Sequence, residues 1–195
     1  MRFTTADKIT VMRLWLLPIA VGLYYVGAVW AYFISALVFL IIAISDFLDG
    51  YVARKMGEIS AFGAFLDPVA DKVCVVVMLI VLASHFSAGH FYIGLFLTCS
   101  TLVISSREII VSALREFMAM RGLRDKVAVK TLGKWKTFAQ CIAIILLTMT
   151  SGYFSPDWLY HVFLYLGLFF LLVAATLTVV SLFTYLKSAR QHLSS

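Results

Sequence analysis

Charged residues are scarce in this chain. Lys, Arg, Asp and Glu make up only 13% of its 195 residues, whereas 63% are hydrophobic and the mean hydropathy is +0.99. Soluble globular domains carry about 25% charged residues, so this composition excludes a water-soluble globule. The sequence therefore predicts an integral membrane protein.

Cysteine and proline are also rare, with three residues of each. The cysteines, Cys74, Cys99 and Cys141, stand singly within apolar runs and lack the paired spacing of a disulfide framework. No low-complexity tract or long linker interrupts the chain. We therefore expect residues 1–195 to form a single membrane domain.

Apolar runs long enough to cross a membrane recur along the chain, since about 20 residues suffice for one helical span. We expect an all-α membrane protein with six transmembrane helices, at 11–30, 32–54, 62–84, 91–114, 132–150 and 158–186. The cap-type residues Thr4, Thr5 and Asp7 stand just before the first run. They predict a short interfacial helix ahead of the first span.

Lysine and arginine are absent from three of the expected connections, at 27–32, 84–90 and 151–158. The basic residues lie instead near both termini and near the other two connections. By the positive-inside rule, both termini are then cytoplasmic. The net charge of +6 reflects this topology and an attraction to anionic membrane lipids and phosphate, so we expect no nucleic-acid partner.

Four carboxylates interrupt the apolar sequence. Asp46 and Asp49 close the second expected span, and Asp67 and Asp71 open the third. The members of each pair are three or four residues apart and therefore share a helix face. Because unpaired carboxylates are costly to bury, a divalent metal is the expected compensation. Oxygen ligands without His or Cys favour Mg²⁺ or Mn²⁺, and two such ions could clamp a phosphoryl displacement.

The residues around these carboxylates suit a phosphate ester. Gly50, Ala53 and Gly63 remove side chains where a bulky phosphate ester or a neighbouring helix must come close. Arg54, one turn after Gly50, offers a planar pair of donors for a pyrophosphate oxygen.

A second set of charged residues lies in the fourth and fifth expected spans. Arg107 and Arg115 lie in the fourth, and Lys134 and Lys136 open the fifth. Such cations can hold a phosphate dianion, and the helix N-terminus adds to their attraction. Glu108 could orient Arg115 or pair with a basic neighbour. The nearby basic residues are interpreted instead as membrane-surface anchors, namely Arg121, Arg124, Lys126 and Lys130.

The carboxylate motif reads Asp46-x2-Asp49-Gly50-x2-Ala53-Arg54-x8-Gly63-x3-Asp67-x3-Asp71. It resembles the signature of the CDP-alcohol phosphotransferases without a departure, which is far more specific than a lone glycine-rich motif. The resemblance implies that the four aspartates hold two metal ions, that Asp71 is also the general base, and that the protein is a homodimer. Gly50, Arg54 and Ser60 would touch the CDP part of the donor. The full set expected to bind CDP-diacylglycerol is Asp49, Gly50, Ala53, Arg54, Ser60, Gly63 and Thr10.

The amino-terminal segment follows the same family pattern in part. Thr10 and Arg13 match it, whereas Asp7 departs from it, because many members have Asn at this position. From the residues alone, an anchoring arginine and a donor contact both remain open for Arg13.

The segments SREIIVSALREFMA and VAVKTLGKWKTFAQ are similar to bacterial phosphatidylglycerophosphate synthases, one branch of that family. This implies sn-glycerol 3-phosphate as the acceptor, and a bacterial inner membrane with the active site facing the cytoplasm. Two alternatives remain open. One is a synthase of the same family that uses phosphatidylglycerol, serine or inositol phosphate; the other is a cation-coupled transporter.

Overall fold

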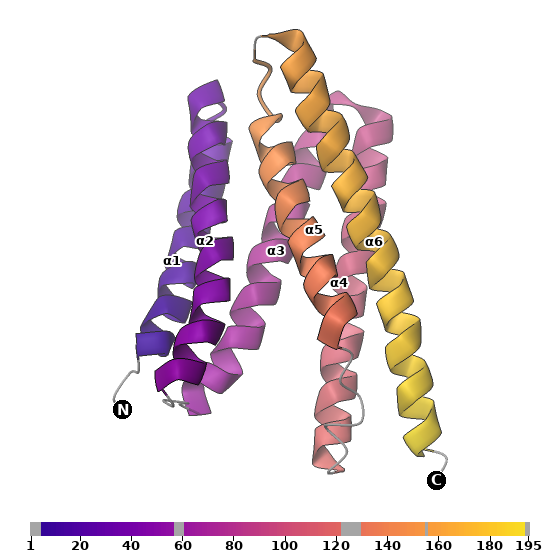
Figure 1. The fold of residues 1–195 in the computed structure, drawn as a ribbon. Coiled ribbons are helices and arrows are strands. Elements are labelled where there is room, and N and C mark those ends of the chain that lie inside the picture. Colours follow the sequence, from indigo (N-terminus) through magenta and orange to yellow (C-terminus); the bar gives the residue numbers. More distant parts are fainter. Residues whose placement is uncertain (1–4, 57–60, 122–129, 155, 194–195) are drawn as a thin grey trace.

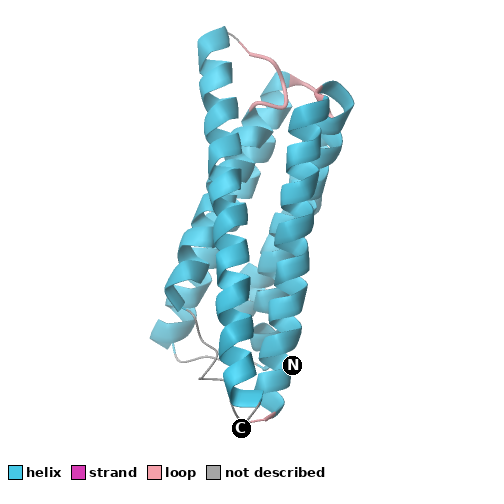
Figure 2. Cartoon of the chain, turned by 90° about the vertical axis from the view of Figure 1, so that its right-hand side faces the viewer, coloured by secondary structure: helices cyan, strands magenta, loops and turns pink. Residues whose placement is uncertain are grey.

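The described part of the chain is entirely helical. The structure, a computed structural model, describes residues 5–56, 61–121, 130–154 and 156–193, and no strand occurs among them. Its six helices are listed here in chain order: α1 (Thr5–Tyr25), α2 (Val29–Met56), α3 (Ala61–Gly89), α4 (Phe91–Met120), α5 (Lys130–Met149) and α6 (Asp157–Leu193). All six run roughly along one long axis (Figures 1 and 2).

Three of the helices are long and apolar enough to cross a membrane, judged on the described residues: 7–25 in α1, all of α4, and 157–187 in α6. A shorter apolar stretch covers 29–45 in α2. Each of the six expected spans overlaps one observed helix, which confirms the all-helical class. The count of six membrane crossings stays a prediction.

The expected separate interfacial helix at the amino terminus is wrong. α1 runs without a break from Thr5 to Tyr25, so the lead-in forms the first turns of the first long helix. No glycine or proline interrupts this stretch before Pro18, and nothing in the local sequence would end a helix there.

Both termini lie at one end of the bundle, together with the end of α2, the start of α3, the end of α4 and the start of α5 (Figure 1). We call this the terminal end. The opposite end carries the turns that join α1 to α2, α3 to α4 and α5 to α6. The α1–α2 turn contains Gly27 with φ of 74°, a backbone conformation that L side chains rarely adopt.

α3 and α5 occupy the middle of the bundle. α3 packs against α1, α4 and α5, whereas α5 packs against α2, α3 and α6. The core that joins them is made of large apolar side chains such as Phe39, Met78, Leu97 and Ile144. Close helix packing also depends on small residues: a Cβ on Gly167 of α6 would lie 2.8 Å from Cγ of Leu147 on α5.

Candidate active site

Two helices contribute the side chains of the first polar cluster, which lies at the terminal end. Asp67 and Asp71 lie one turn apart in α3, and Thr10 and Arg13 lie one turn apart in α1. Thr10 Oγ1 donates a hydrogen bond to Asp67 Oδ1. Arg13 Nη1 donates to Asp71 Oδ1 at 2.5 Å, and Arg13 Nη2 lies 3.7 Å from Asp67 Oδ1. We call these four residues the carboxylate cluster.

The position of Arg13 resolves an ambiguity that the sequence left open. Its side chain is only 2% exposed, whereas those of Asp67 and Asp71 are 39% and 41% exposed. A buried guanidinium paired with two carboxylates is not a membrane-surface anchor. Arg13 therefore belongs to the carboxylate cluster. Asp7, one turn before Thr10, is buried as well.

The other half of the motif lies in α2. The backbone of 46–56 is helical, but the side chains of Asp46, Asp49, Gly50, Ala53 and Arg54 lie outside the described part. Ser60 also lies outside the described residues, and Gly63 is buried in the first turn of α3. The roles expected for these residues stay predictions.

The two helices nevertheless bring both carboxylate pairs to a similar depth. Asp49 precedes the end of α2 by seven residues, and Asp67 follows the start of α3 by six. At 1.5 Å per residue, both lie about 10 Å along the helix from the α2–α3 connection. Ile44, two residues before Asp46, lines the same cavity as Asp71. Convergence of the four carboxylates is therefore compatible with the backbone.

The donor set fits a hard divalent cation. Asp67 and Asp71 present carboxylate oxygens on one helix face, and their partial exposure leaves access for a cation. Among the described side chains, no group of three or more His, Cys, Asp or Glu residues gathers at one place. The remaining two ligands expected for a metal pair, Asp46 and Asp49, fall outside that set.

An apolar cavity of about 510 Å³ opens beside the carboxylate cluster. Arg13 and Asp71 lie on its wall, and the rest of the lining is almost entirely apolar, including Phe39, Phe138 and Ile145. The lining residues come from α1, α2, α3 and α5. The size is within the range of about 300–1,000 Å³ typical of small-molecule sites. A ligand with a charged head and an apolar tail matches this division.

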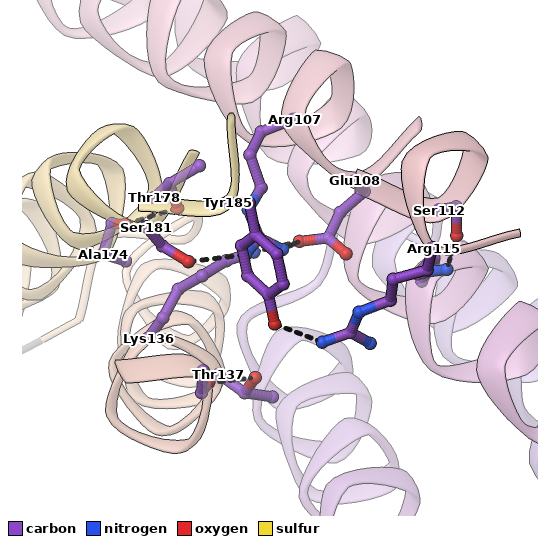
Figure 3. A network of polar contacts seen from close by, with 12 residues as sticks. Arg107, Glu108, Ser112, Arg115, Lys136, Thr137, Ala174, Thr178, Ser181 and Tyr185 are labelled. Atoms are coloured by element: carbon purple, nitrogen blue, oxygen red, sulfur yellow. Dashed lines mark hydrogen bonds and ion pairs between the residues drawn. The ribbon is translucent and has the colours of Figure 1, made fainter. Parts of the chain in front are cut away.

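A second polar cluster joins α4, α5 and α6 (Figure 3). Glu108 Oε1 accepts a hydrogen bond from Lys136 Nζ and lies 3.2 Å from Arg107 Nη1. Arg115 Nη2 donates to the hydroxyl of Tyr185. We call these five residues the cation cluster. The cluster contains three cations and one carboxylate, so its net charge is positive, which suits an anionic ligand.

The structure separates the four cations that the sequence grouped. Arg107 and Lys136 are buried, and Arg115 reaches the same cluster from a more exposed position. Lys134 is exposed, and no contact with the other three is found among the described side chains. Glu108 pairs with Lys136 and Arg107, so of its two expected roles the structure shows the pairing with a basic neighbour and not the orientation of Arg115.

Two chain links connect the cation cluster to the carboxylate cluster. Lys72 follows Asp71 directly, and its ammonium donates to Ser112 Oγ on α4. Thr137 follows Lys136 directly and lines the cavity that Asp71 also lines. Because neighbouring Cα atoms are about 3.8 Å apart, Lys72 joins the carboxylate cluster to α4, and Thr137 joins Lys136 to the cavity that Asp71 lines. The arrangement can hold an anionic group close to the Asp71 carboxylate.

Sequence reasoning missed the α6 contribution. Ser181 and Tyr185 are buried polar residues one turn apart in α6. Ser181 Oγ accepts a hydrogen bond from Arg107 Nη2 at 2.6 Å. The available signal was their four-residue spacing within a largely apolar span, which places both on one helix face.

Comparison with known proteins agrees with these features. Residues 3–186 match the family model described as CDP-alcohol phosphatidyltransferase. Similar bacterial proteins named CDP-diacylglycerol–glycerol-3-phosphate 3-phosphatidyltransferase include one from Salmonella choleraesuis strain SC-B67, 39% identical over 97% of each chain. Others come from Shigella flexneri serotype 5b, 38% identical over 99% of this chain and 98% of the relative, and from Haemophilus influenzae strain Rd, 40% identical over 97% and 95%.

Proposed function

Because the chain belongs to the CDP-alcohol phosphatidyltransferase family, we propose that it is a membrane enzyme that transfers a phosphatidyl group from CDP-diacylglycerol to sn-glycerol 3-phosphate. The products are phosphatidylglycerophosphate and CMP. The observation that carries the proposal is the position of Asp71, whose carboxylate lies at the polar edge of an apolar cavity and one residue from Lys72, which reaches α4. A lipid-linked donor and a phosphorylated, water-soluble acceptor would meet at such a place.

Asp71 acts as the general base in this proposal. Its carboxylate accepts the proton of the free primary hydroxyl of glycerol 3-phosphate as that oxygen attacks the β-phosphorus, which carries diacylglycerol. The bond between this phosphorus and the bridging oxygen breaks, and CMP departs with that oxygen. Arg13 orients the carboxylate through the 2.5 Å hydrogen bond. The 41% exposure of the Asp71 side chain leaves access for the acceptor.

The donor head group would be held by the motif residues of α2 and the start of α3. We assign Gly50, Ala53 and Gly63 to the close approach of the CDP moiety, and Arg54 to its pyrophosphate. Ser60, Asp49 and Thr10 complete the proposed donor contacts. The hydroxyl of Thr10 already bonds Asp67, which supports a place for it at the edge of this site.

Two divalent cations, Mg²⁺ or Mn²⁺, would be held by Asp46, Asp49, Asp67 and Asp71. When bound, they would offset the charge of the pyrophosphate and of the departing CMP. The carboxylate oxygens of Asp67 and Asp71 support this choice, since hard cations prefer such ligands.

The cation cluster would bind the phosphate of the acceptor. Arg107 and Lys136 pair with the Glu108 carboxylate and Arg115 joins the cluster through Tyr185, so the cluster has two excess positive charges that a phosphate dianion would balance. Lys134 would contribute from its exposed position, by attraction rather than direct contact. An acceptor without net charge, such as serine, would leave this excess positive charge uncompensated.

The apolar cavity would receive an acyl chain of the donor. It meets the polar site at Arg13 and Asp71 and is otherwise lined by hydrocarbon. The diacylglycerol part could then stay in the lipid phase while its head group reaches the carboxylate cluster.

The proposal places the enzyme in the bacterial inner membrane with six spans and with the terminal end in the cytoplasm. The absence of Lys and Arg from 27–32, 84–90 and 151–158 supports this orientation, because those segments form the opposite end of the bundle. A homodimer is part of the same proposal, on the resemblance to the family.

The test is release of CMP by purified protein in detergent, supplied with CDP-diacylglycerol, Mg²⁺ and one acceptor at a time. Release should require sn-glycerol 3-phosphate and should fall at least about 100-fold in Asp71→Asn, the lower range for loss of a general base. Asp157→Asn is the matched control, because Asp157 lies in the first turn of α6 at the opposite end.

Each outcome has a direct meaning for the proposal. Release with serine, inositol phosphate or phosphatidylglycerol in place of glycerol 3-phosphate would retain the donor and overturn the acceptor. Equal loss in Asp71→Asn and Asp157→Asn would remove the special role of Asp71. No release with any acceptor would refute the transferase.

A further inference from the structure

α6 contributes an aromatic side chain to the cation cluster. Tyr185 is 1% exposed, so its phenol must find its polar partner inside the protein. One partner is Arg115 of α4, which donates to the Tyr185 hydroxyl. One turn earlier on α6, Ser181 accepts from Arg107. One face of α6 therefore meets both arginines of α4 through two different residues (Figure 3).

The ring of Tyr185 also interacts with both guanidinium groups. The Cζ atom of Arg107 lies 5.2 Å from the ring centroid, and that of Arg115 lies 5.1 Å from it. Both distances are within the range of about 6 Å for attraction between a cation and an aromatic ring. A single buried ring thus stabilises two cations at once.

This arrangement overcomes two obstacles to a paired arginine site. Arg107 and Arg115 are eight residues apart, which separates their Cα atoms by about 12 Å along the helix. Their guanidinium groups also repel each other as like charges. The shared ring nevertheless holds the two Cζ atoms no more than about 10 Å apart. Arg107 is also held by Glu108 and Ser181, so loss of Tyr185 should release Arg115 most.

The two arginines that contact Tyr185 still have N–H groups that can donate hydrogen bonds to a ligand. Arg107 is 6% exposed, and its Nε has no hydrogen-bond partner among the described residues. Buried donors of this kind are normally satisfied, so an additional acceptor is expected there. A phosphate oxygen suits a guanidinium edge because it can accept two parallel hydrogen bonds.

We propose that Tyr185 is a positioning residue that aligns Arg107 and Arg115 as a pair of phosphate ligands, so that the affinity for a phosphorylated acceptor depends on α6. The inference rests on the proposed function of the cation cluster. Tyr185 does not touch the reacting atoms. It holds Arg115 through its hydroxyl and both arginines through its ring.

The test compares Tyr185→Phe, Tyr185→Leu and the wild type by steady-state CMP release. Tyr185→Phe keeps the ring and loses the bond to Arg115, so KM for glycerol 3-phosphate should rise about three- to tenfold. Tyr185→Leu also loses the ring, and the rise should reach about 30-fold or more. KM for CDP-diacylglycerol should stay unchanged in both. Inorganic phosphate, used as a competitor of glycerol 3-phosphate, should bind more weakly in parallel.

Tyr24→Phe is the matched control. Tyr24 is also a buried tyrosine, at 2% exposure, and its hydroxyl lies 2.6 Å from Ser151 Oγ at the opposite end of the bundle. Tyr24→Phe therefore tests the effect of removing the hydrogen bond of a buried tyrosine hydroxyl elsewhere in the protein. KM for glycerol 3-phosphate should not change in this variant.

The outcomes distinguish this inference from the proposed function. A wild type that releases no CMP with glycerol 3-phosphate overturns both. If the wild type is active but Tyr185→Phe leaves KM for glycerol 3-phosphate unchanged, the positioning role alone is overturned. The same conclusion follows if Tyr24→Phe raises this KM as much as Tyr185→Phe does. It also follows if Tyr185→Phe raises KM for CDP-diacylglycerol as much as KM for glycerol 3-phosphate. If Tyr185→Leu does not fold, Tyr185→Phe decides the question.

Discussion

Replacing Glu108 with glutamine should destabilise the folded protein, because it removes the counter-charge of two buried cations. Glu108 is 17% exposed and contacts Lys136 and Arg107, whose side chains are 3% and 8% exposed. Glutamine has nearly the same shape and can still accept a hydrogen bond. The substitution therefore changes charge with little change in packing.

The magnitude follows from the burial of the pair. Breaking a buried ion pair by removing one partner costs about 3–5 kcal/mol, since the remaining charge is left without compensation. Because the substituted glutamine would keep a hydrogen-bond acceptor, we expect the lower end, about 3 kcal/mol. For a protein of 195 residues this corresponds to a decrease in Tm of about 6–12 °C.

Thermal unfolding of the detergent-purified protein measures this effect. Glu116→Gln is the matched control: Glu116 lies on the same helix, eight residues later, and is exposed, so its substitution should leave Tm nearly unchanged. The double variant Glu108→Gln/Lys136→Met removes both charges of the Glu108–Lys136 pair and should recover part of the lost stability, since Arg107 remains without its carboxylate. It should not recover affinity for glycerol 3-phosphate, because Lys136 is one of the proposed phosphate ligands.

The reasoning would be refuted by a Tm for Glu108→Gln equal to that of Glu116→Gln. It would also fail if the two substitutions in the double variant lowered stability additively, since contacting charges must show a coupling energy. Recovery of both stability and acceptor affinity in the double variant would remove Lys136 from the phosphate site.

Three further predictions concern the rest of the site. Arg13→Gln should lower kcat for CMP release about 100-fold, because a small misplacement of Asp71 is costly; an unchanged kcat would contradict its orienting role. Cys141→Trp should fill the apolar cavity and raise KM for a long-chain CDP-diacylglycerol more than for a short-chain one, and equal effects would argue against an acyl site. In a cysteine-free background, Ala88→Cys should react with a membrane-impermeant maleimide in intact cells and Arg121→Cys only after permeabilisation; the reverse pattern would invert the proposed topology.

The helices could be predicted well because each depends on a local property. A run of apolar residues must form its backbone hydrogen bonds within one helix to enter a membrane. The six expected spans accordingly overlap α1 to α6. The exception was the start of α1, where cap-type residues suggested a separate element although nothing breaks the helix after Thr5.

The site could be predicted only as a set of residue types. The spacing of Asp67 and Asp71 places them on one face of a helix in any fold. Their partners Thr10 and Arg13 are more than 50 residues away in sequence. No local pattern predicts which helix will pack against that face. The sequence alone therefore could not distinguish a membrane-surface anchor from a donor contact for Arg13.

The sequence by itself determined the membrane class, the helices and the carboxylate motif, because hydropathy and residue spacing act within a single segment. The tertiary structure decided which charges meet. It buried Arg13 against Asp71, left Lys134 exposed while pairing Lys136 with Glu108, and placed the Tyr185 ring against two arginines. These choices depend on how each helix is rotated toward its neighbours, and that rotation is set by the packing of the whole bundle.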